Sequence, residues 1–245
     1  MIHACFRMRD VLTTRTDPKR NRLRLAAADF FFLLNRSYPR SRSLELTANR
    51  YRLDGSERML LSRGIFSQRQ LLARRAKFQI PAAWRGGLLV VDGHNVQITV
   101  ESRIEGKPLL RANDGALRDI AGLSSRYRFG ETGKMALDMV FDFLRVFPPQ
   151  KLLFLFDEPM SRSGELAAVY RKKLIEAGLA GDARTSPVPE SEFPYEECVA
   201  ASSDSAVIDA ARRWTDLACL VIDYFGAPEI VADFSELVLT KIRNV

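Results

Sequence analysis

The sequence has little of what thiolate metal sites, disulfide frameworks and membrane spans require. Its 245 residues contain three cysteines and two histidines, with no Cys-x-x-Cys pair. Scattered cysteines in odd number are typical of reduced, buried thiols in a cytoplasmic protein. No run reaches the roughly 18 apolar residues that a membrane span needs. We therefore expect a cytoplasmic protein without a membrane partner, in which any metal is held by oxygen ligands rather than in a zinc site.

Several motifs of nucleotide binding and acyl hydrolysis are also missing. The segment Gly-Glu-Thr-Gly-Lys-Met at 130–135 lacks the early glycine of a phosphate loop and the Ser or Thr after its lysine. No Gly-x-Gly-x-x-Gly follows the first predicted strand, which disfavours dinucleotide binding. Without Gly-x-Ser-x-Gly, acyl hydrolysis is disfavoured too. Lys134 is then best interpreted as a surface or substrate-binding charge.

Charge is divided unevenly along the chain. Residues 1–86 contain 19 Lys and Arg against 6 Asp and Glu, a net +13, whereas residues 87–245 contain 18 against 24, a net −6. A basic front joined to an acidic rear favours an anionic partner such as a nucleic acid. Arginine suits phosphate and tyrosine stacks on unpaired bases. The predicted RNA contacts are Arg36, Arg40, Arg42, Arg50, Arg52 and Lys134. The alternative is that Tyr38 and Tyr51 pack inside a helical bundle and the arginines only cover its surface.

The front of the chain is predicted to be helical. Apolar spacing and helix-breaking residues indicate helices near 21–35, 41–50, 56–62 and 67–78. Residues 80–87, Ile-Pro-Ala-Ala-Trp-Arg-Gly-Gly, are interpreted as a linker. This gives a small all-α domain over residues 1–82 and a second domain over 87–245.

In the rear part, several short apolar runs end in an acid. Residues 88–91 end at Asp92, which Gly93 and Asn95 follow. The runs 151–156 and 198–203 end at Asp157 and Asp204, and 217–222 ends at Asp223. Parallel strands bring such ends to one edge of a sheet, where ligands bind in α/β folds. Like charges gathered there repel unless a divalent cation neutralises them. The alternative is that each acid only caps the helix that follows.

Helical patterns alternate with these strands, at 132–146, 163–177 and 205–214. Alternation of strand and helix predicts an α/β fold with a mostly parallel sheet, flanking helices and right-handed crossovers.

Three of these segments resemble motifs of a known protein superfamily. Asp-Gly-His-Asn-Val at 92–96, the strand ending at Asp157, and Ser-Ser-Asp-Ser-Ala-Val-Ile-Asp at 202–209 resemble motifs of the PIN-like and NYN ribonuclease superfamily, over about 87–230. The resemblance implies a PIN-like fold and hydrolysis of RNA with Mg²⁺ or Mn²⁺. The two-part layout also resembles a prokaryotic family of proteins with no assigned function. His94 departs from the usual aromatic residue, and the helix acid of PIN domains has three candidates, Asp119, Glu131 and Asp138.

The leading functional hypothesis is metal-dependent cleavage of RNA phosphodiesters. Asp92, Asp157 and Asp204 would hold the ion, with Asn95 among the catalytic residues and Asp223 or Asp209 in support. One alternative is a non-catalytic RNA- or ribosome-associated adaptor with the same fold. Another is a general α/β phosphoesterase. Binding of a divalent metal would distinguish the nuclease from the adaptor. Activity on a small phosphoester without RNA cleavage would indicate the phosphoesterase.

Overall fold

The computed structural model describes residues 18–120, 128–226 and 230–237. The chain forms two compact units. One combines the front of the chain up to Ala76 with Leu110–Ile120 and the segment from Ile230, and the other comprises Lys77–Leu109 and Ala121–Glu229. We call them the helical unit and the α/β unit.

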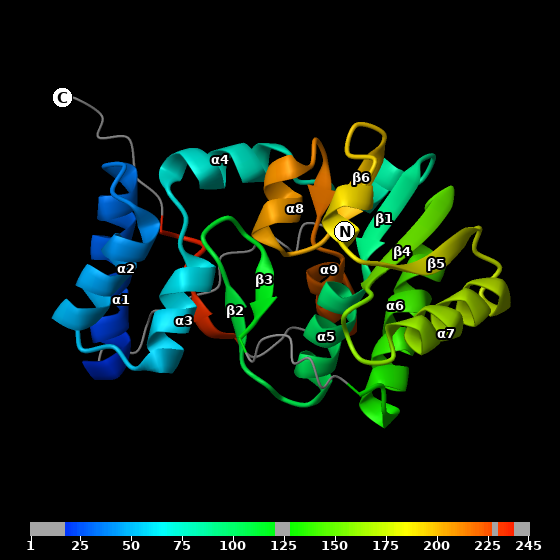
Figure 1. Ribbon diagram of the computed structural model, residues 1–245, viewed down its shortest axis with the longest axis horizontal. Helices are drawn as coiled ribbons and strands as arrows, with labels where there is room; N and C mark the ends of the chain where they lie inside the picture. Colours follow the sequence, from blue (N-terminus) through cyan, green and yellow to red (C-terminus); the bar gives the residue numbers. More distant parts are fainter. Residues whose placement is uncertain (1–17, 121–127, 227–229, 238–245) are drawn as a thin grey trace. The chain divides into compact units, whose positions relative to one another are not determined.

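The α/β unit is built on a five-stranded, all-parallel sheet (Figure 1). Its strands are β1 (Leu88–Asp92), β4 (Lys151–Asp157), β5 (Gly181–Ser186), β6 (Cys198–Ala201) and β7 (Trp214–Thr215), in the order β5-β4-β1-β6-β7. Strand β1 lies between β4 and β6, with Leu88 beside Lys151 on one side and Cys198 on the other. The predicted α/β class with a parallel sheet is confirmed.

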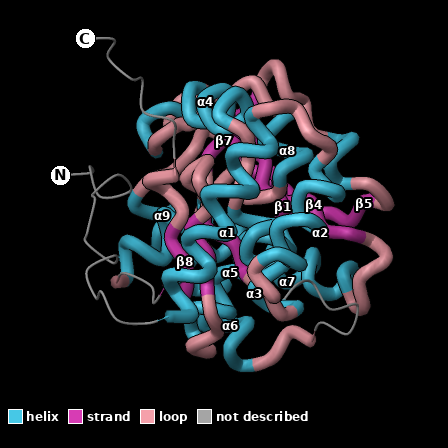
Figure 2. Tube along the Cα trace, turned by 90° about the vertical axis from the view of Figure 1, so that its left-hand side faces the viewer, coloured by secondary structure: helices cyan, strands magenta, loops and turns pink. Residues whose placement is uncertain are grey.

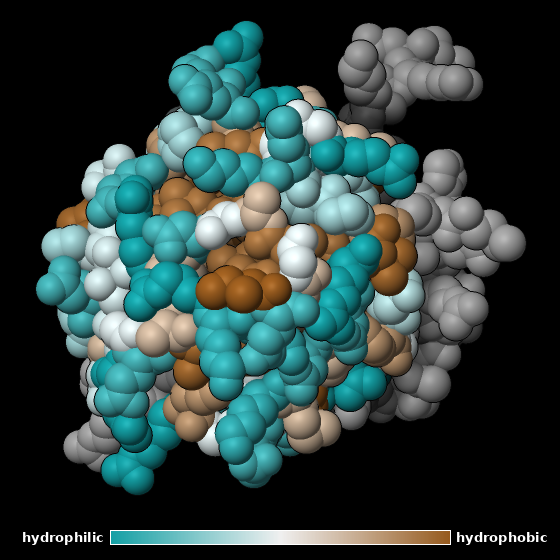
Figure 3. All heavy atoms as spheres, turned by 90° about the vertical axis from the view of Figure 1, so that its right-hand side faces the viewer, coloured by the Kyte–Doolittle hydropathy of each residue, from teal (hydrophilic) through white to brown (hydrophobic). Residues whose placement is uncertain are grey.

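Helices flank this sheet. They are α5 (Gly93–Ile104), α6 (Glu131–Val146), α7 (Ser163–Glu176), α8 (Ser205–Ala210) and α9 (Leu217–Phe225). Helix α7 packs on β4 and β5, α5 packs on β4, and α6 and α9 pack against α5 and each other. Figure 3 shows the face on the right-hand side of Figure 1, where hydrophilic side chains surround smaller apolar patches. Such a surface is expected of helices that bury their apolar face.

Two assignments in this unit were wrong. Residues 217–223 form helix α9, not a strand, because the Asp216 side chain accepts a hydrogen bond from the Cys219 N–H at 2.9 Å and caps a helix. The helix expected over 205–214 ends at Ala210, because Trp214 pairs with Ala200 in the sheet.

The expected linker is also ordered structure. Its residues Pro81–Trp84 form a 3₁₀ turn, η2, and a second such turn, η3, spans Pro189–Glu192. The Trp84 side chain is fully buried and its Nε1–H donates to the Phe147 carbonyl at 3.0 Å. The segment therefore belongs to the α/β unit.

The helical unit contains α1 (Pro18–Asn35), α2 (Arg40–Arg50), α3 (Gly55–Gly64) and α4 (Gln68–Ala76), all of which are labelled in Figure 2. All four match predicted helices. Helix α3 begins with a capping box: the Asp54 carboxylate accepts from the Glu57 N–H at 2.8 Å, and Glu57 accepts from the Asp54 N–H at 2.9 Å. Helices α1 and α2 pack together, and α3 packs on both.

Strands complete the helical unit, so its chain is not the contiguous 1–82 that we expected. A three-stranded sheet runs in the order β3-β2-β8, from β2 (Leu109–Arg111), β3 (Leu117–Asp119) and β8 (Ile230–Asp233). Leu110 and Phe234 join the core of buried α1–α4 residues. The Asn113 side chain accepts from the Phe66 N–H at 2.9 Å and donates to the Phe66 carbonyl at 2.8 Å.

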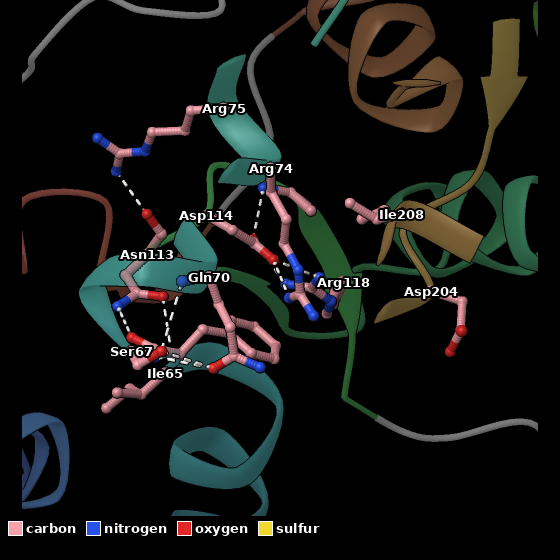
Figure 4. A network of polar contacts seen from close by, with 12 residues as sticks. Ile65, Ser67, Gln70, Arg74, Arg75, Asn113, Asp114, Arg118, Asp204 and Ile208 are labelled. Carbon is pink, nitrogen blue, oxygen red and sulfur yellow. Dashed lines mark hydrogen bonds and ion pairs between the residues drawn. The ribbon is translucent and has the colours of Figure 1, made fainter. Parts of the chain in front are cut away.

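A buried ionic cluster also joins these segments (Figure 4). The carboxylate of Asp114 accepts from Arg74 Nη1 at 2.7 Å and from both terminal nitrogens of Arg118 at 2.8 and 2.9 Å. Both guanidinium groups lie over the Phe66 ring, 4.0 and 5.0 Å from its centroid. The paired arginines hold the pKa of Asp114 below its ordinary value against the opposing effect of burial.

Within the residues that the structure describes, no helix is long and apolar enough to cross a membrane.

Candidate active site

The sheet order brings three predicted acids to one edge. Asp92 ends the central strand β1, Asp157 ends the neighbouring strand β4, and Asp204 follows β6 on the other side. All three strands are parallel, so these residues share the carboxyl edge. Asp204 is exposed and the Asp157 side chain is 32% exposed, so solvent reaches this edge.

Asp92 is both a helix cap and a member of this acidic edge. One carboxylate oxygen accepts from the Asn95 N–H at 3.2 Å, at the start of α5, and the other accepts from Ser202 Oγ at 2.8 Å. The pKa of Asp92 rises from its ordinary value of 3.8 to about 7, mainly because of burial. The two hydrogen bonds oppose this rise, and the negative charges of Asp157 and Asp204 add to it. Asp157 and Asp204 therefore both act electrostatically on Asp92.

This shift predicts a specific pH dependence of stability. The folded pKa of Asp92 is about 7 and its ordinary value is 3.8, so the native state keeps a proton that the unfolded chain loses. Without metal, the free energy of unfolding should fall as pH rises from about 4 to 7, by on the order of 2 kcal/mol after allowance for water screening. Urea denaturation in EDTA at pH 5 and pH 8 measures this. The Asp92→Asn variant should not show this fall in the free energy of unfolding. An identical pH dependence in the variant would contradict the raised pKa of Asp92.

Ser202 joins Asp92 to the loop that carries Asp204. Its Oγ accepts from the Asp204 N–H at 2.9 Å, which directs its own hydrogen toward Asp92. The Asp204 carboxylate accepts from the Ala206 N–H at 2.7 Å and caps α8. Sequence reasoning named Asp204 but missed Ser202, although the Ser-Ser-Asp turn signalled a loop of this kind.

Asn95 has a different role from the one we predicted. Its Oδ1 accepts from both the N–H of Ser203, at 2.9 Å, and the Oγ of Ser203, at 3.1 Å. Its amide oxygen is thus committed to the turn after β6. Asn95 is a positioning residue that holds this turn against the start of α5, and Ser203 is its partner.

His94 fixes the end of β4. Its ring is fully buried, and Nδ1 accepts from the Asp157 N–H at 3.0 Å and lies 3.2 Å from Asp157 Oδ2. The preceding residue, Gly93, lets the Phe156 ring of β4 pack closely against the start of α5, since a Cβ at Gly93 would lie 2.4 Å from Phe156 Cε1. The buried imidazole therefore positions Asp157.

Tyr195 is a further residue that the sequence did not reveal. Its ring stacks on Phe193 with centroids 5.4 Å apart, and its hydroxyl donates to the Glu190 carbonyl at 2.8 Å. Burial raises its pKa to about 12, with smaller contributions from nearby negative charges that include Asp204 and Asp92. No sequence motif marks it.

The other predicted acids lie elsewhere. Asp223 is on α9, where it accepts from Cys219 Sγ at 3.5 Å, so its assignment as a strand-end metal ligand was wrong. Asp209 is exposed on the second turn of α8.

The three candidates for the helix acid differ in position as well. Asp119 lies in strand β3 and not on a helix. Glu131 and Asp138 are on α6, where they pair with Lys134 and Lys173.

The predicted RNA-contacting residues fall into two groups. Arg40 is committed internally: it donates to the carbonyls of Ile65 and Ser62 and lies over the Phe66 ring. Burial and the charges of neighbouring arginines lower its pKa to about 10. This internal bonding distinguishes Arg40 from the other residues predicted to contact RNA. The others are exposed: Arg36, Arg42, Arg50, Arg52 and Lys134.

The donor chemistry of the sheet edge suits a hard divalent cation, because it offers carboxylate oxygens, and the charges of Asp157 and Asp204 disfavour the ionisation of Asp92. Among the described residues, however, no group of three or more His, Cys, Asp or Glu is already arranged to hold a metal. Binding would require the side chains of Asp92, Asp157 and Asp204 to draw together.

The comparison with known families also divides the chain into two parts. The chain belongs to the family described as "Domain of unknown function (DUF5616)", which matches residues 81–219, more than half of the chain. The family "Protein of unknown function (DUF434)" matches residues 22–77. The junction between the two matches coincides with the change of unit after Ala76.

One relative is similar over most of the chain. It is "Uncharacterized protein MJ0935" of Methanocaldococcus jannaschii, 27% identical over 201 residues, which are 81% of this chain and 96% of the relative. No solved structure matches.

Proposed function

We propose that this protein hydrolyses phosphodiester bonds in RNA with the help of Mg²⁺ or Mn²⁺. The observation that carries the proposal is the placement of Asp92, Asp157 and Asp204 at the carboxyl edge of neighbouring parallel strands, where the charges of Asp157 and Asp204 both act on Asp92. Such an edge is the usual ligand-binding position in open α/β folds. The basic front of the chain, net +13 over residues 1–86, supports an anionic polymer as substrate.

The residues of the edge divide into ligands and supports. Asp92, Asp157 and Asp204 would hold the ion, which when bound supplies a nucleophilic water and neutralises phosphate charge. Ser202 orients Asp92, Asn95 holds the 202–204 turn, and His94 holds the end of β4. These supports would fix the carboxylates in a narrow set of positions, as outer contacts of metal ligands do elsewhere.

The direct test is cleavage of end-labelled single-stranded RNA by the purified full chain. We expect products with Mn²⁺ or Mg²⁺ and none in EDTA. Hydrolysis of p-nitrophenyl phosphate without RNA cleavage would instead identify a general phosphoesterase. A cytoplasmic location accompanies the proposal, since Cys198 and Cys219 are buried free thiols.

A second candidate is a non-catalytic RNA-binding adaptor. One observation favours it: the described residues contain no ready-made group of three metal-ligating side chains. RNA binding without metal-dependent cleavage would establish the adaptor and exclude the nuclease.

Ser202→Ala tests the supporting contacts. Loss of the hydroxyl removes a hydrogen bond that lowers the pKa of Asp92 and leaves the Asp204 N–H without that acceptor. We expect the acid limb of the pH–rate profile to move to higher pH, with kcat reduced about 10-fold or more and KM little changed.

Ser203→Ala is the matched control. The backbone N–H of Ser203 still donates to Asn95 after its hydroxyl is removed, so the turn keeps one of its two bonds. Its pH–rate profile should match that of the wild-type protein. Equal profiles for all three proteins would show that Ser202 has no positioning role.

A further inference from the structure

Two large aromatic side chains are exposed where α1 passes into α2. Phe32 is 54% exposed and Tyr38 is 57% exposed, whereas the neighbouring Phe30 and Phe31 are buried. We call the segment from Phe32 to Arg42 the α1–α2 corner. Tyr51, by contrast, donates its hydroxyl to Asp29 at 2.8 Å. The interpretation that both front tyrosines pack inside the bundle therefore applies to Tyr51 and not to Tyr38.

The backbone of the corner is held in a fixed conformation. Ser37 has φ 63°, in the left-handed region that residues other than glycine seldom adopt. The N–H of Tyr38 donates to a carbonyl in the last turn of α1 at 3.2 Å. Arg40 anchors the start of α2 to the carbonyls of Ile65 and Ser62. A strained residue that its surroundings hold in place is a common feature of binding sites.

The corner is positively charged. Residues 30–44 contain three arginines and no Asp or Glu. Arg36 lies over the Phe32 ring, with its Cζ 5.2 Å from the ring centroid. The Arg42 side chain is 80% exposed and pairs with the exposed Glu45 at 3.2 Å, a contact that water weakens. Both cations are thus accessible to a phosphate.

We propose that the α1–α2 corner is a docking surface for single-stranded RNA. Phe32 and Tyr38 stack on unpaired bases, and Arg36 and Arg42 contact the backbone phosphates. Exposed rings interleaved with arginines match the bases and phosphates of a single strand, whose bases are free to stack, unlike those of a duplex. The inference rests on the proposed function for the identity of the nucleic acid.

The test is binding of a fluorescein-labelled polyuridylate to the full chain, followed by fluorescence anisotropy in EDTA to stop metal-dependent cleavage. Phe32→Ala and Tyr38→Ala should each raise the Kd for RNA by about 5-fold or more, the usual loss of affinity when one stacking ring is removed. Tyr38→Phe keeps the ring and should bind like the wild-type protein. Arg36→Gln should weaken binding and flatten its dependence on salt.

Two exposed positions outside the corner supply matched controls. Leu46→Ala removes an exposed apolar side chain from α2, and Lys172→Gln removes an exposed charge from α7. Both should leave Kd within about 2-fold of the wild-type value, since neither side chain offers a stacking surface within the corner.

Several results would overturn the proposal. One is an unchanged Kd in both aromatic variants, and another is an equal loss in Leu46→Ala. A third is that the aromatic variants keep RNA affinity but lose binding to phosphatidylserine-containing vesicles, or lose self-association. Failure of the proposed function is separate: if Asp92→Asn still cleaves RNA while the corner variants lose binding, the docking surface stands and the sheet-edge assignment falls.

Discussion

Replacing Asp92 by Asn is expected to reduce metal-dependent RNA cleavage by about 100-fold or more while the protein stays folded. Asp92 ends the central strand and is the acid whose pKa responds to both Asp157 and Asp204. Loss of its charge removes a metal ligand. Even the loss of a residue that only supports a metal ligand typically lowers metal affinity or activity 10- to 100-fold. The cleavage rate of end-labelled RNA, measured at saturating Mn²⁺, gives the effect. Circular dichroism checks the fold.

Asp223→Asn is the matched control, because it removes a carboxylate from helix α9 and leaves the sheet edge intact. It should keep wild-type activity, and Asp157→Asn and Asp204→Asn should resemble Asp92→Asn. If Asp92→Asn cleaves as fast as Asp223→Asn, the edge is not the catalytic centre.

Asp114→Ala should have the largest effect on stability. The carboxylate is buried and accepts hydrogen bonds from Arg74 and Arg118, which are buried too. Removing one partner of a buried ion pair leaves uncompensated charge and typically costs about 3–5 kcal/mol. We expect a loss of this size in the free energy of unfolding of the helical unit, measured by urea denaturation.

An exposed pair provides the comparison. Asp142 lies 3.1 Å from Arg145, three residues further along α6, and both side chains are about half exposed. Asp142→Ala should cost roughly 0.5 kcal/mol or less, because water screens such pairs. A similar small cost for Asp114→Ala would show that the buried cluster is not required for stability.

The strands that carry the candidate site were predictable because each is a short run of apolar or small residues with an acid at or just after its end. Strands β1 and β4 end in Asp92 and Asp157, and Asp204 follows β6 after two serines. Such a run fits a strand buried on both faces. The same criterion failed at residues 217–223, because a short apolar run can equally form a buried helix. The deciding feature there was Asp216, whose side chain caps α9.

Other elements carried too weak a signal. Strand β5, Gly-Asp-Ala-Arg-Thr-Ser, lies at the edge of the sheet and has few apolar residues. Strand β7 has two residues and depends on pairing with β6. The extension of the helical unit by residues 110–120 depends on long-range contacts such as Asn113 with Phe66, which no local pattern records.

The site residues show the same division. The sequence identified the acids, but the roles of Asn95 and Ser202 depend on hydrogen bonds between β1, α5 and the turn after β6. Those bonds exist only because β1 and β6 are neighbours in the sheet. In the front of the chain, Arg40 looked like its neighbours in sequence, and only its bonds to α3 and Ile65 distinguish it.

The most direct measurement of the central claim is anomalous diffraction from crystals of the full chain soaked in Mn²⁺. We predict a manganese peak at the carboxyl edge of the sheet, with carboxylate oxygens of Asp92 and Asp157 within about 2.6 Å of it and with Asp204 bound directly or through water. Crystals of Asp92→Asn should lack the peak. The metal site would be contradicted if wild-type crystals held manganese only at other positions and none at these three carboxylates.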